Sequence, residues 1–148
     1  MPFCDEFLII TNEKYVNIVE GQMKVFQSLR YRVLLEGNPR GTAPAIALGC
    51  MFCNQSELVF VVSSDNLIEG KEYQDAILTA KDMAKKGQIV LFGVKPNKPS
   101  TSYGYIKRDG QDIIKFIERA DYEEAPQYTY EKNYLWNSGI FLCRAGDF

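Results

Sequence analysis

The hydrophobic positions of the chain alternate between short apolar runs and longer segments with helical spacing. The apolar runs predict buried strands over residues 7–10, 32–36, 58–62 and 89–94. Apolar residues recurring at intervals of three and four predict helices over residues 15–26, 43–52 and 72–86. Because strands and helices alternate, the pattern predicts an α/β fold with a mainly parallel sheet, in which the β-branched run 58–62 is central.

The ends and surfaces of the predicted helices carry their own signals. Thr11 or Asn12 could cap the first helix by accepting hydrogen bonds from its free amides. Gly87 follows the third helix at the position where a left-handed glycine often ends a helix. The middle helix, 43–52, is rich in alanine and nearly apolar all round, so we expect it to be buried.

The last third of the chain departs from this alternation. Residues 103–107 and 113–118 predict strands on either side of a turn signal at Arg108–Gly110. The polar and aromatic stretch 120–133 predicts a loop or a short helix, and an apolar run follows over 134–143. No internal repeat or linker divides the sequence, which favours a single domain.

Composition excludes several classes of protein. The 148 residues are 46% hydrophobic and 24% charged, with a net charge of -2, which excludes disorder as the main state. A near-neutral charge argues against nucleic-acid binding, which needs a dense basic surface. No apolar run approaches the length of a membrane span, and the N-terminal residues show no signal-type pattern. We therefore expect a cytoplasmic protein that binds neither nucleic acid nor membranes.

The absence of histidine narrows the chemistry further. It excludes Ser-His-Asp and Cys-His catalysis and zinc sites that need imidazole, and it favours magnesium with oxygen ligands. Cys50 and Cys53 form a Cys-x-x-Cys pair, but a zinc ribbon would need a second pair and a redox motif would need a strand-to-helix setting. We therefore expect buried, reduced thiols.

Several polar residues follow predicted strands, where open parallel sheets bind their ligands. Asp65 could hold magnesium beside a polyphosphate, although an aspartate there could equally form a turn or cap a helix. Ser63 and Ser64 fit either interpretation. The loop 37–42 precedes a helix N-terminus, whose free amides favour anions; the alternative is a simple turn with a cap at Thr42.

Three further places in the last third could contact a ligand. Gly104 lies between two tyrosines and marks either a close ligand approach or a strand whose aromatic rings pack on opposite faces. Glu118 and Arg119 end a predicted strand, either as a solvated pair or as groups for sugar hydroxyls and a phosphate. Asn137 and Ser138 interrupt an apolar run, so each must bond either the local backbone or a ligand.

Some of these residues belong to recognisable motifs. Residues 134–142 read YLWNSGIFL and residues 42–48 read TAPAIAL. These segments resemble the YLWNSGIF and NTAPAIAL segments of the mannose-1-phosphate guanylyltransferase family. Residues 60–68, 103–106 and 116–119 also resemble segments of that family, in the same order. The resemblance extends over essentially the whole chain.

The resemblance implies a Rossmann-like, GT-A-like nucleotidyltransferase fold. Its mostly parallel sheet would carry a mixed sugar-binding portion and would be incomplete, with residues 1–148 forming the central part of one domain. The implied reaction joins mannose 1-phosphate to GTP with Mg²⁺, giving GDP-mannose and pyrophosphate. Such chemistry depends on positioning and charge neutralisation more than on acid–base groups, so it tolerates the absence of histidine. A homo-oligomer is compatible with this family.

The family's functional residues match positions in this chain. Asp65 would hold magnesium and would act with Arg119, which stands where the family has a phosphate-contacting lysine. The nucleotide-binding positions would be Arg40, Gly41, Thr42, Pro44 and Ser64. The sugar-binding positions would be Gly104, Tyr105, Glu118 and Asn137.

Departures from the family pattern keep alternatives open. Gly41 replaces a family asparagine, and Ser63 and Ser64 replace a Pro-Ala pair before the metal ligand, which leaves room for another nucleotide or another sugar 1-phosphate. The family's glycine-rich triphosphate loop and its second metal-binding aspartate would lie outside residues 1–148. We therefore expect the isolated chain to be inactive, as part of such an enzyme or as a non-catalytic binding module derived from one.

Overall fold

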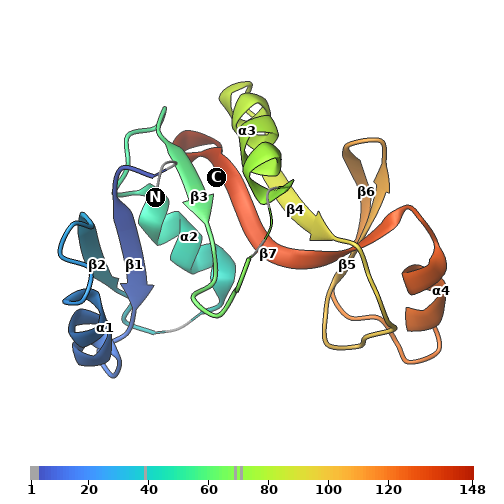
Figure 1. Ribbon diagram of the computed structural model, residues 1–148, viewed down its shortest axis with the longest axis horizontal. Helices are drawn as coiled ribbons and strands as arrows, with labels where there is room; N and C mark the ends of the chain where they lie inside the picture. Colours follow the sequence, from blue (N-terminus) through green and yellow to red (C-terminus); the bar gives the residue numbers. More distant parts are fainter. Residues whose placement is uncertain (1–3, 39, 69, 71) are drawn as a thin grey trace. The chain divides into compact units, whose positions relative to one another are not determined.

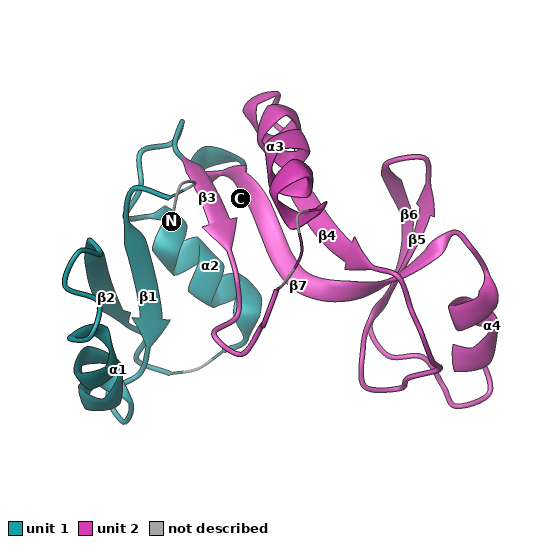
Figure 2. Ribbon diagram, viewed as in Figure 1, with its two compact units in different colours: residues 1–57, 145–148 teal, residues 58–144 magenta. Residues whose placement is uncertain are grey.

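The computed structural model of the protein describes residues 4–38, 40–68, 70 and 72–148 (Figure 1). Predictions that involve residues 1–3 or Pro39 lie outside the described residues. The chain divides into two compact units, residues 1–57 with 145–148, and residues 58–144 (Figure 2). Of the helices in the described ranges, none combines the length and the apolar character that crossing a bilayer requires.

The first unit is a parallel strand pair with its helices. Its described elements are β1 (Phe7–Thr11), α1 (Val16–Met23), β2 (Tyr31–Leu35), α2 (Thr42–Cys50) and a short 3-10 helix, η1 (Ala145–Asp147). β1 and β2 pair in parallel, with Ile9 opposite Val33. A Cβ atom on Gly49 of α2 would stand 3.1 Å from Cδ1 of Ile10, so α2 packs closely on β1 at that glycine.

The start of α1 differs from the prediction. The residue at its N-cap is Tyr15, which makes no side-chain capping bond. Asn12 instead closes the turn before the helix: its Oδ1 accepts from the Lys14 N–H at 3.0 Å, and its carbonyl accepts from the Tyr15 N–H at 3.1 Å. Thr11 is the last residue of β1. Neither predicted cap is therefore correct, because the side chain that would cap the helix stabilises the preceding turn.

Helix α2 is buried on one face only. Ile46, Gly49 and Cys50 are buried, whereas Ala43 and Ala47 are exposed. The expectation of burial all round is therefore wrong. Alanine is apolar but small, so exposing its side chain to water costs little free energy. An exposed alanine still favours a helix, because its helix propensity is high.

The second unit contains a sheet with helices on it. Its described elements are β3 (Leu58–Val61), α3 (Glu72–Lys85), β4 (Val90–Val94), β5 (Tyr105–Asp109), β6 (Asp112–Ile117), α4 (Ala125–Tyr130) and β7 (Tyr134–Arg144). The long strand β7, orange to red in Figure 1, pairs on both edges. Its residue Leu142 lies opposite Phe60 of β3 and Val90 of β4. β5 pairs with the first half of β7, with Tyr105 opposite Trp136, and β6 pairs with β5.

This sheet confirms the α/β class but corrects one pairing. The run 58–62 was expected at the centre of a parallel sheet; in the described part of the chain, β3 pairs antiparallel with β7. β3 and β4 run in the same direction, as expected for strands joined by a crossover helix, but β7 lies between them. The run is also less buried than expected, since every residue of β3 is half-buried and Val62 is exposed. The apolar run therefore predicts the strand but neither its full burial nor its neighbours.

Two apolar clusters cover different parts of β7. Ala80 and Ala84 of α3 pack with Leu142, and the facing residues of β3 and β4 complete this cluster. At the first half of β7, the cluster contains Tyr105, Tyr128 and Tyr134. The ring centroid of Tyr128 lies 5.5 Å from that of Tyr105 and 4.7 Å from that of Tyr134. β7 is thus the common element of both cores.

Two predicted turns are confirmed. Gly87 has φ 89°, and it ends α3 in a Schellman motif in which Gly87 N–H donates to Ala84 and Gln88 N–H donates to Met83, at 2.9 and 3.4 Å. Gly110, with φ 58°, lies in the turn that joins β5 to β6. In both places a glycine provides the left-handed backbone that the turn needs.

The turn after α2 makes stability depend on pH. The Asn54 N–H donates to Glu57 Oε2 at 2.6 Å, and hydrogen bonds from the backbone and then the side chain of Asn54 lower the pKa of Glu57 below its ordinary 4.5. Because this pKa is lower in the folded state, the carboxylate stabilises the fold above about pH 4.5 and loses that contribution as the pH falls through the folded pKa. We expect the free energy of unfolding to fall less between pH 6 and pH 3 in Glu57→Gln than in the parent, as measured by urea denaturation. An unchanged slope would contradict this.

Candidate functional site

The turn that carries Asp65 lies at the C-terminal end of β3. Ser64 and Asp65 form this turn, which the Asn66 N–H closes by donating to the Ser63 carbonyl at 3.3 Å. Both residues are exposed. The Ser63 Oγ stands 4.0 Å from the place that a Cβ on Gly139 would occupy. The carboxylate of Asp65 is therefore presented to solvent from a turn that lies beside the middle of β7.

The middle of β7 contains a bulge. Gly139 has φ 71°, and the register with β4 shifts between Leu91 and Gly93. Asn137 Oδ1 accepts from the Gly139 N–H at 2.9 Å. The Ser138 hydroxyl donates to the Phe92 carbonyl and accepts from the Ile140 N–H at 3.2 Å.

These bonds answer one question that the sequence left open. The side-chain oxygens of Asn137 and Ser138 bond the backbone of the bulge. The bulge is therefore a fixed feature of the strand. The amide nitrogen of Asn137 can donate to a ligand, and its amide oxygen, which accepts one bond from Gly139, keeps one lone pair.

Three of the predicted sugar positions are brought together around Gly104. The Gly104 carbonyl accepts from the Asn137 N–H at 2.8 Å. A Cβ at position 104 would stand 3.3 Å from the carbonyl oxygens of both Ile117 and Glu118. Glu118 and Arg119 are exposed in the bend after β6. Gly104, Glu118 and Asn137 thus belong to one neighbourhood, although they lie on separate segments of the chain.

The surroundings of Gly104 correct two expectations. Gly104 precedes β5, so it is not inside a strand. Tyr103 lies in a bend before the strand and is exposed, whereas Tyr105 is fully buried, so the two rings are not a pair on opposite faces of one strand. The Tyr103 ring instead packs on Trp136, with 4.9 Å between ring centroids, and Trp136 packs against the cluster that contains Tyr105.

Tyr105 is a core residue. Its side chain is fully buried. Its hydroxyl donates to the Ser100 carbonyl and accepts from the Ser100 N–H, both at 3.0 Å. A contact between its side chain and a sugar is therefore excluded in this arrangement, and only the backbone of Tyr105 could meet a ligand.

The predicted nucleotide residues of the first unit surround the start of α2. Arg40, Gly41, Thr42 and Pro44 are all exposed there. The N-cap is Gly41, with φ 94° and ψ -177°, and no side chain caps the helix. The predicted cap at Thr42 is therefore wrong by one residue, and Thr42 is the first residue of the helix. Its amide is among the free N–H groups that an anion could accept.

Gly41 offers a matched test of backbone strain. The backbone at Gly41 lies in a region that side-chain-bearing residues rarely adopt, whereas Gly37 has no such φ. At either position, no atom of the described residues would lie within 4 Å of an added Cβ. We expect Gly41→Ala to lower the free energy of unfolding by about 1–3 kcal/mol. Gly37→Ala should change it by no more than about 1 kcal/mol. Chemical denaturation of both variants checks this, and equal effects would contradict it.

A hollow that the sequence did not predict lies in the same unit. It measures about 230 Å³ and is lined by Asn12, Glu13, Lys14, Gly37 and Asn38. These residues follow β1 and β2, so the hollow lies at the carboxyl ends of a parallel strand pair. That is where such sheets bind ligands. Applying this rule to the first strand would have identified Asn12 and its neighbours.

The donors in the second unit fit a magnesium ion better than a structural metal. Across the described ranges, no group of three or more His, Cys, Asp or Glu side chains could hold a metal ion. Magnesium keeps several waters and binds through one or two carboxylates together with substrate phosphates. The exposed Asp65, with the hydroxyls of Ser63 and Ser64 beside it, is a donor set of that kind.

Comparisons with known proteins agree on one family. The family model described as nucleotidyl transferase matches residues 3–148. Mannose-1-phosphate guanylyltransferase ManC of Salmonella typhimurium is 35% identical over an alignment of 159 positions, which covers 97% of this chain and 33% of the relative. The chain thus spans about a third of the length of the curated relatives it matches.

Two solved structures are also similar. One, from Helicobacter pylori, is described as a mannose-6-phosphate isomerase; it is 35% identical with a TM-score of 0.92, and the match covers 99% of this chain and 59% of that one. The other, from Thermus thermophilus, is described as a mannose-1-phosphate geranyltransferase. It is 29% identical with a TM-score of 0.75, over 95% of this chain and 42% of that one.

Proposed function

The chain belongs to the nucleotidyl transferase family, with its Rossmann-like α/β fold, and from this premise we propose that it serves an enzyme that makes GDP-mannose and pyrophosphate from mannose 1-phosphate and GTP. The observation that carries the proposal is the neighbourhood around the middle of β7. There, Gly104, Glu118 and Asn137 come together, and the turn of Asp65 lies beside the bulge in the same strand. A sugar-phosphate site and a metal-binding carboxylate are the groups that this reaction requires.

The substrates are inferred from the relatives. ManC of Salmonella typhimurium is named as a mannose-1-phosphate guanylyltransferase, and the names of both structural relatives contain a mannose phosphate. The family match over residues 3–148 favours nucleotidyl transfer over isomerisation as the reaction of this chain.

Each proposed residue has a distinct task. Magnesium bound at Asp65 would neutralise phosphate charge and hold the triphosphate in position. Glu118 would accept hydrogen bonds from sugar hydroxyls, and the Asn137 amide nitrogen would donate to a sugar oxygen. Arg119 would place a permanent positive charge near the sugar phosphate. The free amides at the start of α2 and Arg40 would favour the anionic nucleotide.

Gly41 supports a second candidate, transfer from another nucleotide. Its φ of 94° with ψ of -177° is a conformation that the family's asparagine would adopt only with strain. The loop on the base side therefore has a backbone path suited to glycine. A different base or a different sugar 1-phosphate remains the alternative that this observation favours.

A substrate panel tests the proposal. The protein that contains this sequence, at its natural length, would be assayed for pyrophosphate release with four NTPs and several sugar 1-phosphates in the presence of Mg²⁺. We expect the GTP and mannose 1-phosphate pair to give the highest kcat/KM. A higher value with another pair would establish the second candidate. Binding of GDP-mannose without turnover of any pair would show a non-catalytic module. The cytoplasmic location and a homo-oligomeric state stay predictions.

A further inference from the structure

Three sulfur-bearing residues line one pocket of the first unit. The pocket measures about 370 Å³, and Cys50, Met51 and Cys53 contribute to its wall. Cys50 is the last residue of α2, whereas the proposed nucleotide residues lie at the start of that helix. The pocket is therefore separate from every residue that the proposed reaction uses.

Backbone hydrogen bonds hold the two cysteines in one turn. The Cys53 N–H donates to the Cys50 carbonyl at 3.1 Å, and the Cys53 thiol donates to the Gly49 carbonyl at 3.5 Å. Residues three apart in a helical turn lie on the same side. Both cysteines are free rather than joined in a disulfide. The residues that carry two thiols and a thioether thus line one pocket.

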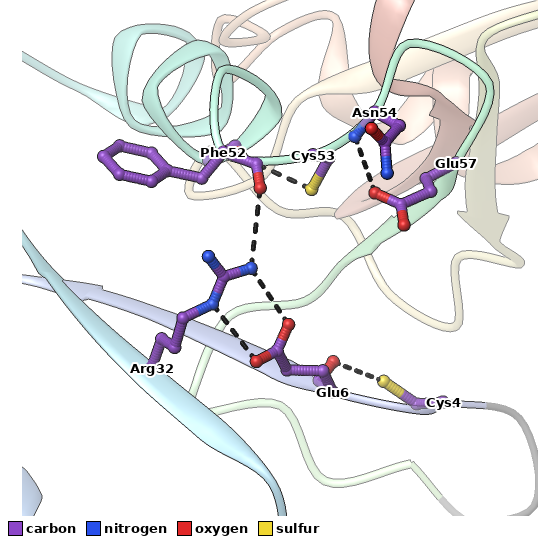
Figure 3. Close-up of polar contacts among 8 residues, drawn as sticks. Cys4, Glu6, Arg32, Phe52, Cys53, Asn54 and Glu57 are labelled. Atoms are coloured by element: carbon purple, nitrogen blue, oxygen red, sulfur yellow. Dashed lines mark hydrogen bonds and ion pairs between the residues drawn. The ribbon is translucent and has the colours of Figure 1, made fainter.

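Backbone hydrogen bonds hold another part of the pocket wall, at residues 145 and 146. The Gly146 N–H donates to the Gln55 carbonyl at 3.0 Å, and the Ala145 N–H donates to the Glu57 carbonyl at 2.9 Å. Nearby, Arg32 forms an ion pair with Glu6 at 2.9 Å and also reaches the Phe52 carbonyl at 3.5 Å (Figure 3). The bond between Gly146 and Gln55 joins two lining residues, so the backbone holds this part of the pocket wall in place, and the Arg32 ion pair lies outside the lining.

We propose that Cys50, Met51 and Cys53 form a binding site for a soft monovalent cation such as Cu(I), with the two cysteines as the main ligands. Thiolates and thioethers are the donors that Cu(I) prefers, and this ion is satisfied by few ligands. Zinc requires four ligands in structural sites, and the described residues offer no group of three or more His, Cys, Asp or Glu side chains for a metal. Two thiols and a thioether therefore favour a soft metal ion that needs few ligands over zinc.

The binding step balances in protons and charge. Burial raises the pKa of both Cys50 and Cys53, so each is a thiol before the metal arrives. One Cu(I) bound by both sulfurs displaces two protons and leaves a bis-thiolate complex with a charge of about −1. No oxidant or reductant takes part, because the copper and both sulfurs keep their oxidation states.

A competition titration tests this site. The reduced protein would be titrated anaerobically with Cu(I) against a chromophoric Cu(I) chelator. We expect one Cu(I) per chain, and Cys53→Ser and Cys50→Ser should each weaken binding at least about 100-fold, more than the usual cost of losing an outer-shell partner. Met51→Leu should weaken it less. Cys4→Ser is the matched control, because the Cys4 thiol donates to the Glu6 carbonyl outside this pocket, and it should bind as tightly as the parent.

Three results would overturn the proposal: no Cu(I) retained against the chelator, equal affinity in Cys53→Ser, or loss of binding in Cys4→Ser. Displacement of bound Cu(I) by equimolar Zn²⁺ would also overturn it. Because Cys50 is buried, Cys50→Ser could fail to fold, which circular dichroism would reveal. Cys53→Ser and Met51→Leu then decide the matter.

Discussion

Asp65→Asn is expected to lower Mg²⁺-dependent formation of GDP-mannose by roughly 10²–10³-fold, the scale of losing one well-placed electrostatic group. Asp65 lies in an exposed turn, so the substitution removes a negative charge without removing a packed side chain. The variant should therefore unfold at the same denaturant concentration as the parent. Steady-state kinetics at several Mg²⁺ concentrations, together with urea denaturation, measure both effects.

A matched aspartate separates a metal ligand from a turn residue. Asp82 is exposed on α3, and Asp82→Asn removes the same charge elsewhere in the second unit. It should leave both activity and stability close to those of the parent. If Asp65→Asn also leaves kcat/KM and its Mg²⁺ dependence unchanged, Asp65 serves the turn alone, and its assignment as a metal ligand is wrong.

Tyr105→Ala is expected to lower the free energy of unfolding by about 3–5 kcal/mol, the usual cost of truncating a large core side chain. Tyr105 is fully buried and packs on Tyr128, and its hydroxyl makes two hydrogen bonds to Ser100. Tyr105→Phe keeps the ring and loses only those bonds, so it should cost about 1–3 kcal/mol. Denaturant unfolding of the two variants gives both values.

An exposed tyrosine provides the comparison. Tyr122 is 88% exposed, and Tyr122→Ala should change stability by about 0.5 kcal/mol or less. If Tyr105→Ala behaves like Tyr122→Ala, the placement of Tyr105 in the core is wrong. A large loss of kcat/KM in Tyr105→Phe, with stability retained, would instead indicate that the Tyr105 hydroxyl contacts the sugar.

Local sequence patterns predicted most elements but not how strands pair. The turn glycines Gly87 and Gly110 were predictable, because each provides a backbone conformation that the local chain requires. The antiparallel pairing of β3 with β7 was not, since these strands lie far apart in the chain. A continuous apolar run predicts that a strand is present, whereas its burial and its long-range pairing depend on the rest of the fold: every residue of β3 is only half-buried.

The residues of the candidate site were also predictable only in part. The resemblance identified Gly104, Glu118 and Asn137, and the structure brings these three segments together. It could not reveal that Tyr105 faces the core, because tyrosine is common both in cores and at ligand sites. Nor could a motif indicate that Asn137 has its oxygen engaged by Gly139, since that bond depends on the bulge.

The most direct test of the proposed transfer uses mannose 1-phosphate labelled with ¹⁸O in its phosphate. The protein containing this sequence, at its natural length, would be incubated with the labelled sugar, GTP and Mg²⁺, and the products analysed by mass spectrometry. Attack of the sugar phosphate on the α-phosphorus of GTP predicts that all of the label appears in GDP-mannose and that pyrophosphate is unlabelled. Label in pyrophosphate, or the absence of GDP-mannose, would contradict the proposed function.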